Sequence, residues 1–170
     1  MTEVTAKKLY HQKADSAEAA YHEGGLRAFF IYRSTEMEKA TDNQLRTVFV
    51  RAAAPAGLIP GGMGTGEHYH VAEDSPRGFH AFVVTKGWLR FKYEGVDTLV
   101  KEGDLVHQPI ADEGGKGIKH MLYDWSFPVD AAGNPTGEPA AEFIEFTSPG
   151  FGTHQLTPSG AAMEPPKPKM

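Results

Sequence analysis

The feature that most restricts the fold of this chain is a series of short aromatic and β-branched runs between positions 27 and 147. Gly, Pro, Asn and Asp separate the runs, and helical periodicity is almost absent after residue 25. Short runs bounded by turn residues are typical of strands in an all-β sandwich or barrel. The expected strands cover residues 27–33, 45–53, 67–71, 79–86, 87–94, 97–102, 104–109, 118–125 and 141–147. The sequence therefore predicts an all-β domain.

The two ends of the chain differ in composition from this central part. Residues 1–26 are polar and rich in Ala, and they predict an N-terminal arm with a short helical or irregular segment. Such a helix would begin at Asp15 or Ser16 and end at Gly24 and Gly25. Residues 159–170 hold several prolines and no apolar pattern, which predicts a disordered tail or an extended arm lying on a neighbouring chain. The β-domain is accordingly assigned to residues 27–158.

Charge and composition exclude several classes of function. The net charge of -5 comes from 17 basic and 22 acidic residues without a Lys/Arg run, so we expect no nucleic-acid partner. No apolar run approaches the roughly 20 residues that span a bilayer. The first residues also lack the apolar stretch of a signal peptide, so we expect no membrane association and a cytoplasmic location. The chain has no cysteine, so any metal ion must be held by His, Asp or Glu.

A histidine-rich stretch, GTGEHYHVAEDSPRGFHAFVVTKG at residues 64–87, is the strongest candidate for a functional site. His68 and His70 lie two residues apart in an expected strand, so their side chains point to the same face and can reach one metal ion. Short strands carry such a pair by chance, and unrelated polar side chains are the alternative interpretation. The spacing of the surrounding residues strengthens the metal interpretation: Gly62, Gly87, Gly103, Pro109, Gly117 and His120.

These positions resemble the two signature motifs of the cupin superfamily. The first motif reads Gly, five residues, His-x-His, three or four residues, Glu, six residues, Gly. The second reads Gly, five residues, Pro-x-Gly, two residues, His, three residues, Asn. Residues 62–87 and 103–124 match most fixed positions in order. The phrases FFIYRSTEMEKAT, VTKGWLRFKYEG, GDLVHQP and EFTSPGF look like one branch of small single-domain cupins (monocupins). The resemblance implies a double-stranded β-helix, the jelly-roll barrel of cupins, that holds one divalent metal ion per chain.

The resemblance also assigns the ligands of that ion. His68 and His70 correspond to the pair of the first motif, and His120 corresponds to the histidine of the second. His80 stands at the glutamate position, because it keeps the six-residue distance to Gly87. It remains open whether His80 is a fourth ligand, a catalytic acid/base group or a buried histidine bonded to backbone.

Two departures from the family pattern concern loop length. Residues 71–79 and 111–116 lengthen the gaps within the two motifs. Such insertions are expected near the barrel mouth, where they can act as a lid. We also expect a turn between neighbouring strands to bring His80 back beside His70. Asp124 stands where the family has Asn.

Several further side chains are candidates for the walls of the site. Phe82, Trp88 and Tyr123 are expected to line a cavity and to select an apolar or aromatic substrate. His107 is expected in the core or the cavity wall, with Gln108 facing the other way. The remaining histidines, His11, His22 and His154, are expected to be exposed.

A site of neutral imidazoles suits several metals and leaves the ion strongly electrophilic. We expect Fe(II), with Zn, Mn, Ni or Cu as alternatives. The leading hypothesis is a non-haem Fe(II)-type dioxygenase acting on a small diketone, enol or phenolic substrate. The alternatives are a non-redox isomerase, cyclase or lyase, in which His80 or a carboxylate moves a proton, and a non-catalytic module that binds a metal or small ligand. We expect a homodimer, in which the strand at 27–33 is a candidate for exchange between copies.

Overall fold

The computed structural model describes residues 10–23, 27–59, 64–72, 78–110, 117–148, 151–156 and 162–163. In these ranges the chain forms eleven strands and one short helix, α1 (Met37–Ala40), with 3-10 turns at Ala17–Ala19 and Ala56–Leu58. The strands are β1 (Phe30–Ser34), β2 (Arg46–Ala52), β3 (His68–Ala72), β4 (His80–Lys86), β5 (Trp88–Tyr93), β6 (Val96–Lys101), β7 (Leu105–His107), β8 (His120–Trp125), β9 (Glu142–Thr147), β10 (Phe151–Leu156) and β11 (Ala162–Met163). Within the described ranges, no helix has the length and apolar character needed to cross a membrane.

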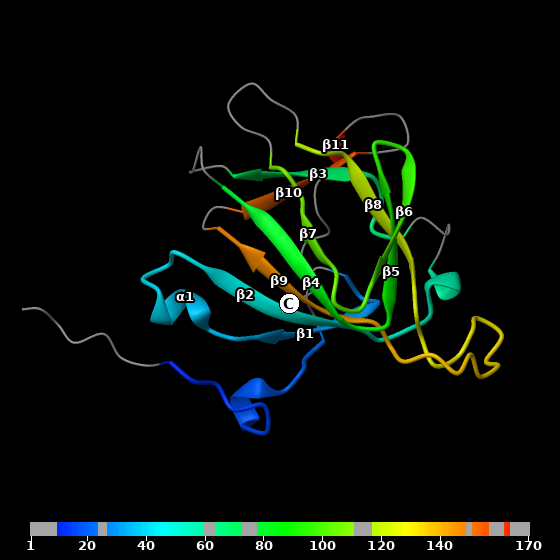
Figure 1. Cartoon of the computed structure of the whole chain (residues 1–170), viewed down its shortest axis with the longest axis horizontal. Coiled ribbons are helices and arrows are strands. Elements are labelled where there is room, and N and C mark those ends of the chain that lie inside the picture. The colour runs from blue at the N-terminus through cyan, green and yellow to red at the C-terminus, as the bar shows by residue number, and fades with distance from the viewer. Residues whose placement is uncertain are drawn as a thin grey trace, which may run out of the picture.

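The strands form two antiparallel sheets that make the two walls of a jelly-roll barrel (Figure 1). One sheet has the order β1-β2-β9-β4-β7, and the other has the order β11-β10-β3-β8-β5-β6. Strands far apart in sequence are neighbours in space, as when β2 pairs with β9 and β3 pairs with β10 and β8. This exchange of the chain between two sheets is the jelly-roll topology that removes most free strand edges. The predicted all-β jelly-roll class is confirmed.

All nine predicted strands are present, with ends shifted by a few residues. The sequence did not predict β10, β11 or α1. In β10 the segment FGTHQL has a glycine and little alternation, and β11 and α1 are too short to produce a periodic pattern. β11 lies within the expected tail and pairs with β10.

The expected N-terminal helix is only a 3-10 turn at Ala17–Ala19. Ser16 precedes this turn without a capping hydrogen bond from its side chain, and the backbone is already extended at Ala20. His22 then forms a bridge with Tyr32 of β1. The expected end at Gly24 and Gly25 lies outside the described residues.

An apolar core lies between the two sheets. Its fully buried side chains include Val50, Phe82, Val84 and Leu89, which alternate with outward-facing neighbours along their strands. Burying each such side chain contributes about 1.5–3 kcal/mol. Trp125 packs on Phe30 with ring centroids 5.0 Å apart, and its indole N–H donates to a backbone carbonyl. The same packing forms the walls of the cavity described next.

Candidate metal centre and cavity

Three buried histidines of the six-stranded sheet meet inside the barrel. His68 and His70 lie on one face of β3, and His120 of β8 is directly opposite His68 in the strand register. One ring nitrogen from each residue lies within 4.8 Å of the others. The three side chains are 3–6% exposed, so protein and not bulk water surrounds them. The sequence-predicted triad is therefore brought together, and its geometry can bind a metal ion.

Backbone carbonyls orient two of these rings. Nδ1 of His68 lies 2.8 Å from the carbonyl oxygen of Gly66, and Nδ1 of His120 lies 2.9 Å from that of Ile118. A carbonyl only accepts hydrogen bonds, so Nδ1 must carry the proton and Nε2 must carry the lone pair. Nε2 of His120 then lies 3.1 Å from Nε2 of His70. A cation shared by these nitrogens fits this arrangement, because it would satisfy converging lone pairs.

The environment keeps the imidazoles neutral. Burial lowers the pKa of His68 to about 3 and the pKa of His120 to about 4. Burial also lowers the pKa of His70, and the neighbouring His80 lowers it further. Neutral imidazole is the form that binds metal ions. The three residues are therefore in the ligating state at neutral pH.

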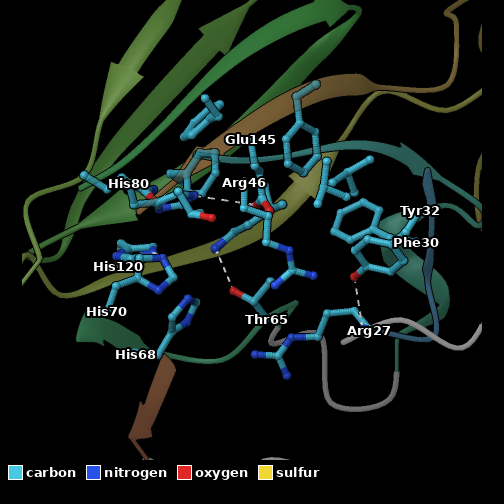
Figure 2. Close-up of a pocket in the computed structure, with 18 of the residues that line it drawn as sticks. Arg27, Phe30, Tyr32, Arg46, Thr65, His68, His70, His80, His120 and Glu145 are labelled. Atoms are coloured by element: carbon cyan, nitrogen blue, oxygen red, sulfur yellow. Dashed lines mark hydrogen bonds and ion pairs between the residues drawn. The ribbon is translucent and has the colours of Figure 1, made fainter. Parts of the chain in front are cut away.

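His80 reaches the same place from the opposite sheet. Its ring centroid lies 4.4 Å from that of His70, and the side chain is buried. It is not among the three residues whose ligand nitrogens all lie within 4.8 Å of one another. Its Nε2 instead lies 3.8 Å from Oε1 of Glu145, on the adjacent strand β9 (Figure 2).

This arrangement corrects one expectation about the chain path. β3 and β4 are consecutive in sequence but belong to different sheets, so no turn between neighbouring strands places His80 beside His70. His80 approaches across the interior of the barrel. Residues 73–77 and 111–116, which make up most of the two expected lid insertions, lie outside the described residues.

The histidines form one end of a cavity of about 410 Å³. In Figure 2 the four histidines lie at one side, and Phe30 and Tyr32 lie at the other. Most of its other walls are apolar and come from both sheets: Phe30, Val48, Val50, Phe82, Phe91, Leu122 and Phe143. Its volume lies in the usual range for small-molecule sites.

Of the predicted cavity-lining residues, only Phe82 lies in the wall. Trp88 and Tyr123 do not, because the alternation of β5 and β8 turns Leu89 and Leu122 inward and these two residues outward. His107 is exposed, whereas Gln108 is 1% exposed and lines the cavity. We predicted that His107 faces the interior and Gln108 the other way, and the structure has the opposite arrangement.

The chain is similar to known proteins in fold rather than in sequence. Protein-family profiles gave no match to the sequence, and curated protein sequences also gave none. Among solved structures, an RmlC-like cupin protein from Ralstonia eutropha JMP134 has a TM-score of 0.52 at 11% identity. The similarity covers 88% of this chain and 74% of the other. The chain therefore has the fold of this cupin protein.

Two further solved structures are similar to this chain at lower TM-scores. Salicylate 1,2-dioxygenase from Pseudaminobacter salicylatoxidans has a TM-score of 0.46 at 14% identity, covering 75% of this chain and 30% of its own. The chain thus spans less than a third of that protein's length. A predicted oxalate decarboxylase from Thermotoga maritima has a TM-score of 0.42 at 18% identity, covering 70% of this chain and 79% of its own.

Sequence reasoning missed several polar residues that line the cavity, among them Arg27, Arg46, Gln108 and Glu145. Gln108 donates from Nε2 to the Tyr93 hydroxyl at 2.9 Å and is hydrogen-bonded to His70. Glu145 lies between the apolar residues Ile144 and Phe146 of β9, and that interruption was a usable signal. Arg27 lies outside any strand, so no periodicity could indicate its direction.

A glycine fixes the segment that leads into β3. Gly64 has φ +50°, and a Cβ there would lie 1.9 Å from the Leu122 carbonyl oxygen. This close approach lets Thr65 N donate to Leu122 O at 2.8 Å, and Leu122 N donate to Thr65 Oγ1 at 3.0 Å. These contacts hold the start of β3 against β8, two residues from His120.

Proposed function

We propose that this protein is a metal-dependent enzyme, and that it is a non-haem Fe(II)-type dioxygenase acting on a small organic substrate. The observation that carries the proposal is the buried triad His68, His70 and His120 at one end of a cavity of about 410 Å³. Three protein ligands leave coordination positions free for other molecules. The cavity beside them gives a diketone, enol or phenolic compound room to approach.

The donor set fits a first-row transition metal. Imidazole ligands suit Fe, Zn, Cu and Ni, and His68, His70 and His120 contribute no negative charge. Bound Fe(II) would supply the redox chemistry that side chains lack. The apolar walls around it exclude water from the reacting groups.

The contribution of the chain itself would come from His80 and Glu145. Nε2 of His80 lies between the triad and the Glu145 carboxylate, at 3.8 Å from Oε1. We infer that the imidazole of His80 accepts a proton from a bound enol or phenol and that Glu145 stabilises the imidazolium so formed. Substrate would then bind as the more electron-rich anion.

The same proton-accepting pair favours a second candidate function. In a non-redox isomerase, cyclase or lyase, a Zn or Ni ion on the triad would polarise a carbonyl group, and His80 would move the proton. This reaction needs His80 and Glu145 but not dioxygen. The two functions therefore differ in whether the reaction consumes dioxygen.

The metal assignment is tested by the metal content of protein purified without added metal. We expect about one ion per chain, and we expect His68→Ala and His120→Ala to lose it. His107→Ala is the matched control, because His107 is exposed and outside the cavity. Full metal content in both triad variants would show that the site is elsewhere.

The reaction is tested by oxygen uptake with a panel of small diketones and phenols after loading with Fe(II). Substrate-dependent uptake that His68→Ala abolishes supports the dioxygenase. Zinc as the only metal found, with no uptake even after iron loading, counts against it and favours the non-redox function.

We also infer a cytoplasmic homodimer. β1 is the outermost strand of its sheet, so β2 pairs with only one of its two hydrogen-bonding edges. On the other edge, the structure has an isolated bridge between Tyr32 and His22. Edge strands of this kind are commonly covered by a second copy. A molar mass of one chain in solution, measured by light scattering, would contradict the dimer.

A further inference from the structure

The charged side chains of the cavity have an excess of positive charge. Arg27 and Arg46 line it, and Glu145 is the one carboxylate among the described lining residues. Two guanidinium groups therefore line the cavity against a single carboxylate. A divalent ion on the triad would add to this excess.

Neither arginine has an acceptor within the part of the chain that the structure describes. Nε of Arg27 is buried and makes no hydrogen bond, and neither Arg27 nor Arg46 takes part in a salt bridge there. By contrast, Arg51 pairs with Glu142 at 3.2 Å and Arg90 pairs with Asp97 at 3.3 Å. A partly buried guanidinium whose Nε has no acceptor is costly, so Arg27 favours an anionic partner in the cavity.

The positions of the two arginines define where such a partner binds. Arg46 begins β2 on the face that carries Val48 and Val50, and it is exposed to solvent. Arg27 is half-buried, and its backbone N–H donates to the Tyr32 hydroxyl at 3.1 Å. Arg27 and the three histidines of the triad line the same cavity. Figure 2 shows both arginines beside the cavity that the histidines close.

Aromatic side chains line the same cavity as the arginines and the histidines. They are Phe30, Phe82, Phe91 and Phe143, and the rings of Phe82 and Phe91 are stacked with centroids 5.3 Å apart. Such walls favour a flat apolar group. An occupant that satisfies both features has an aromatic ring and one carboxylate.

We propose that the cavity binds a small aromatic monocarboxylate, with its carboxylate on Arg27 and Arg46 and its ring against the phenylalanines of the wall. Guanidinium groups match the planar geometry of a carboxylate and can bind it through two parallel hydrogen bonds. This assignment names the substrate class of the proposed enzyme. It rests on the proposed function only for the expectation that the part of the ring opposite the carboxylate is directed toward the metal. The binding itself requires neither metal nor turnover.

The test is calorimetric titration of the metal-free, full-length protein with benzoate, phenylacetate and 3-phenylpropanoate, each compared with its primary amide. At least one acid is expected to bind roughly tenfold or more tightly than its amide, because only the acid forms charge-assisted hydrogen bonds. Arg27→Met and Arg46→Met should bring that acid to the affinity of the amide. Arg90→Met is the matched control, since Arg90 pairs with Asp97 outside the cavity.

Lysine variants keep the test decisive if a methionine variant does not fold. Arg27→Lys and Arg46→Lys retain the charge without the planar donors, and an affinity between wild type and amide level is expected. Equal affinity of acids and amides, no binding of any acid, or an unchanged preference in the arginine variants would each overturn the proposal. The titration uses no metal and no oxygen. A negative titration therefore does not contradict the proposed dioxygenase, and a negative oxygen-uptake assay does not contradict the binding of a carboxylate.

Discussion

His80 differs from the other three clustered histidines in its neighbours. His68 and His120 are each oriented by a backbone carbonyl, whereas His80 stands across the barrel with Nε2 3.8 Å from a Glu145 oxygen. A metal ligand needs its lone pair aimed at the ion, and a proton carrier needs a partner for the charge it gains. The neighbours of His80 match the second requirement.

Replacing His80 therefore separates the two roles. We expect His80→Ala to keep about one metal ion per chain, because the triad remains, and to lower substrate-dependent oxygen uptake by roughly 10²- to 10⁴-fold, the usual contribution of a general base. Glu145→Gln, which keeps the shape of the side chain but removes its charge, should lower uptake less. Metal analysis and oxygen uptake on the same samples check this. Loss of the metal in His80→Ala would make His80 a fourth ligand.

The sequence allowed the triad to be predicted because its residues sit in strands with fixed direction. Two residues on one strand at a spacing of two must share a face, and the glycine spacing related His120 to them. His107 and Gln108 could not be oriented in this way, because β7 has only three residues and no apolar alternation. Arg27 lies in a connection, where side-chain direction depends on tertiary contacts alone.

At the scale of elements, the triad depends on how β3 is held against β8. The strand register between them consists of the single pair His68 and His120. The Gly64 and Thr65 contacts to Leu122 extend this contact beyond the pair. The sequence predicted both strands but not their pairing, since this joins segments about fifty residues apart in the chain, with no local signal for it.

A substitution at Gly64 tests this connection. Gly64→Ala would place Cβ 1.9 Å from a backbone oxygen that cannot rotate away, in addition to the strain of φ +50°. Gly95→Ala is the control, because Gly95 has φ +84° and a Cβ added there would meet nothing within 4 Å. The control should cost about 1–2 kcal/mol of unfolding free energy from backbone strain alone. Gly64→Ala should cost more and should weaken metal binding; equal denaturant midpoints for the two variants would contradict this.

At the scale of the whole molecule, the two sheets contribute different side chains to one site inside the barrel. The six-stranded sheet supplies the triad, and the five-stranded sheet supplies His80, Glu145 and Arg46. The site therefore exists only when the barrel is closed. The three histidines of the triad, enclosed in this way, carry an energetic cost that depends on pH.

The metal-free protein should lose stability as the pH falls from about 7 to 5. The pKa of His68 is about 3 and that of His120 about 4 in the folded chain, against an ordinary value of 6.5 for histidine. Below pH 6.5 the unfolded chain therefore binds protons that the folded chain does not, and the unfolding free energy decreases on the order of 1 kcal/mol per pH unit per histidine. Above pH 7 this contribution is constant.

Denaturant midpoints of the metal-free protein at pH 7.5, 6 and 5 measure this slope. His68→Phe should reduce it, because one buried titrating group is removed, whereas His107→Ala should leave it unchanged, because His107 is exposed. Metal loading should raise the midpoint most at pH 7.5, since ligand protonation competes with the ion at lower pH. A midpoint that is constant from pH 7.5 to 5 would mean that the triad titrates alike in the folded and unfolded chains, which burial at 3–6% exposure forbids.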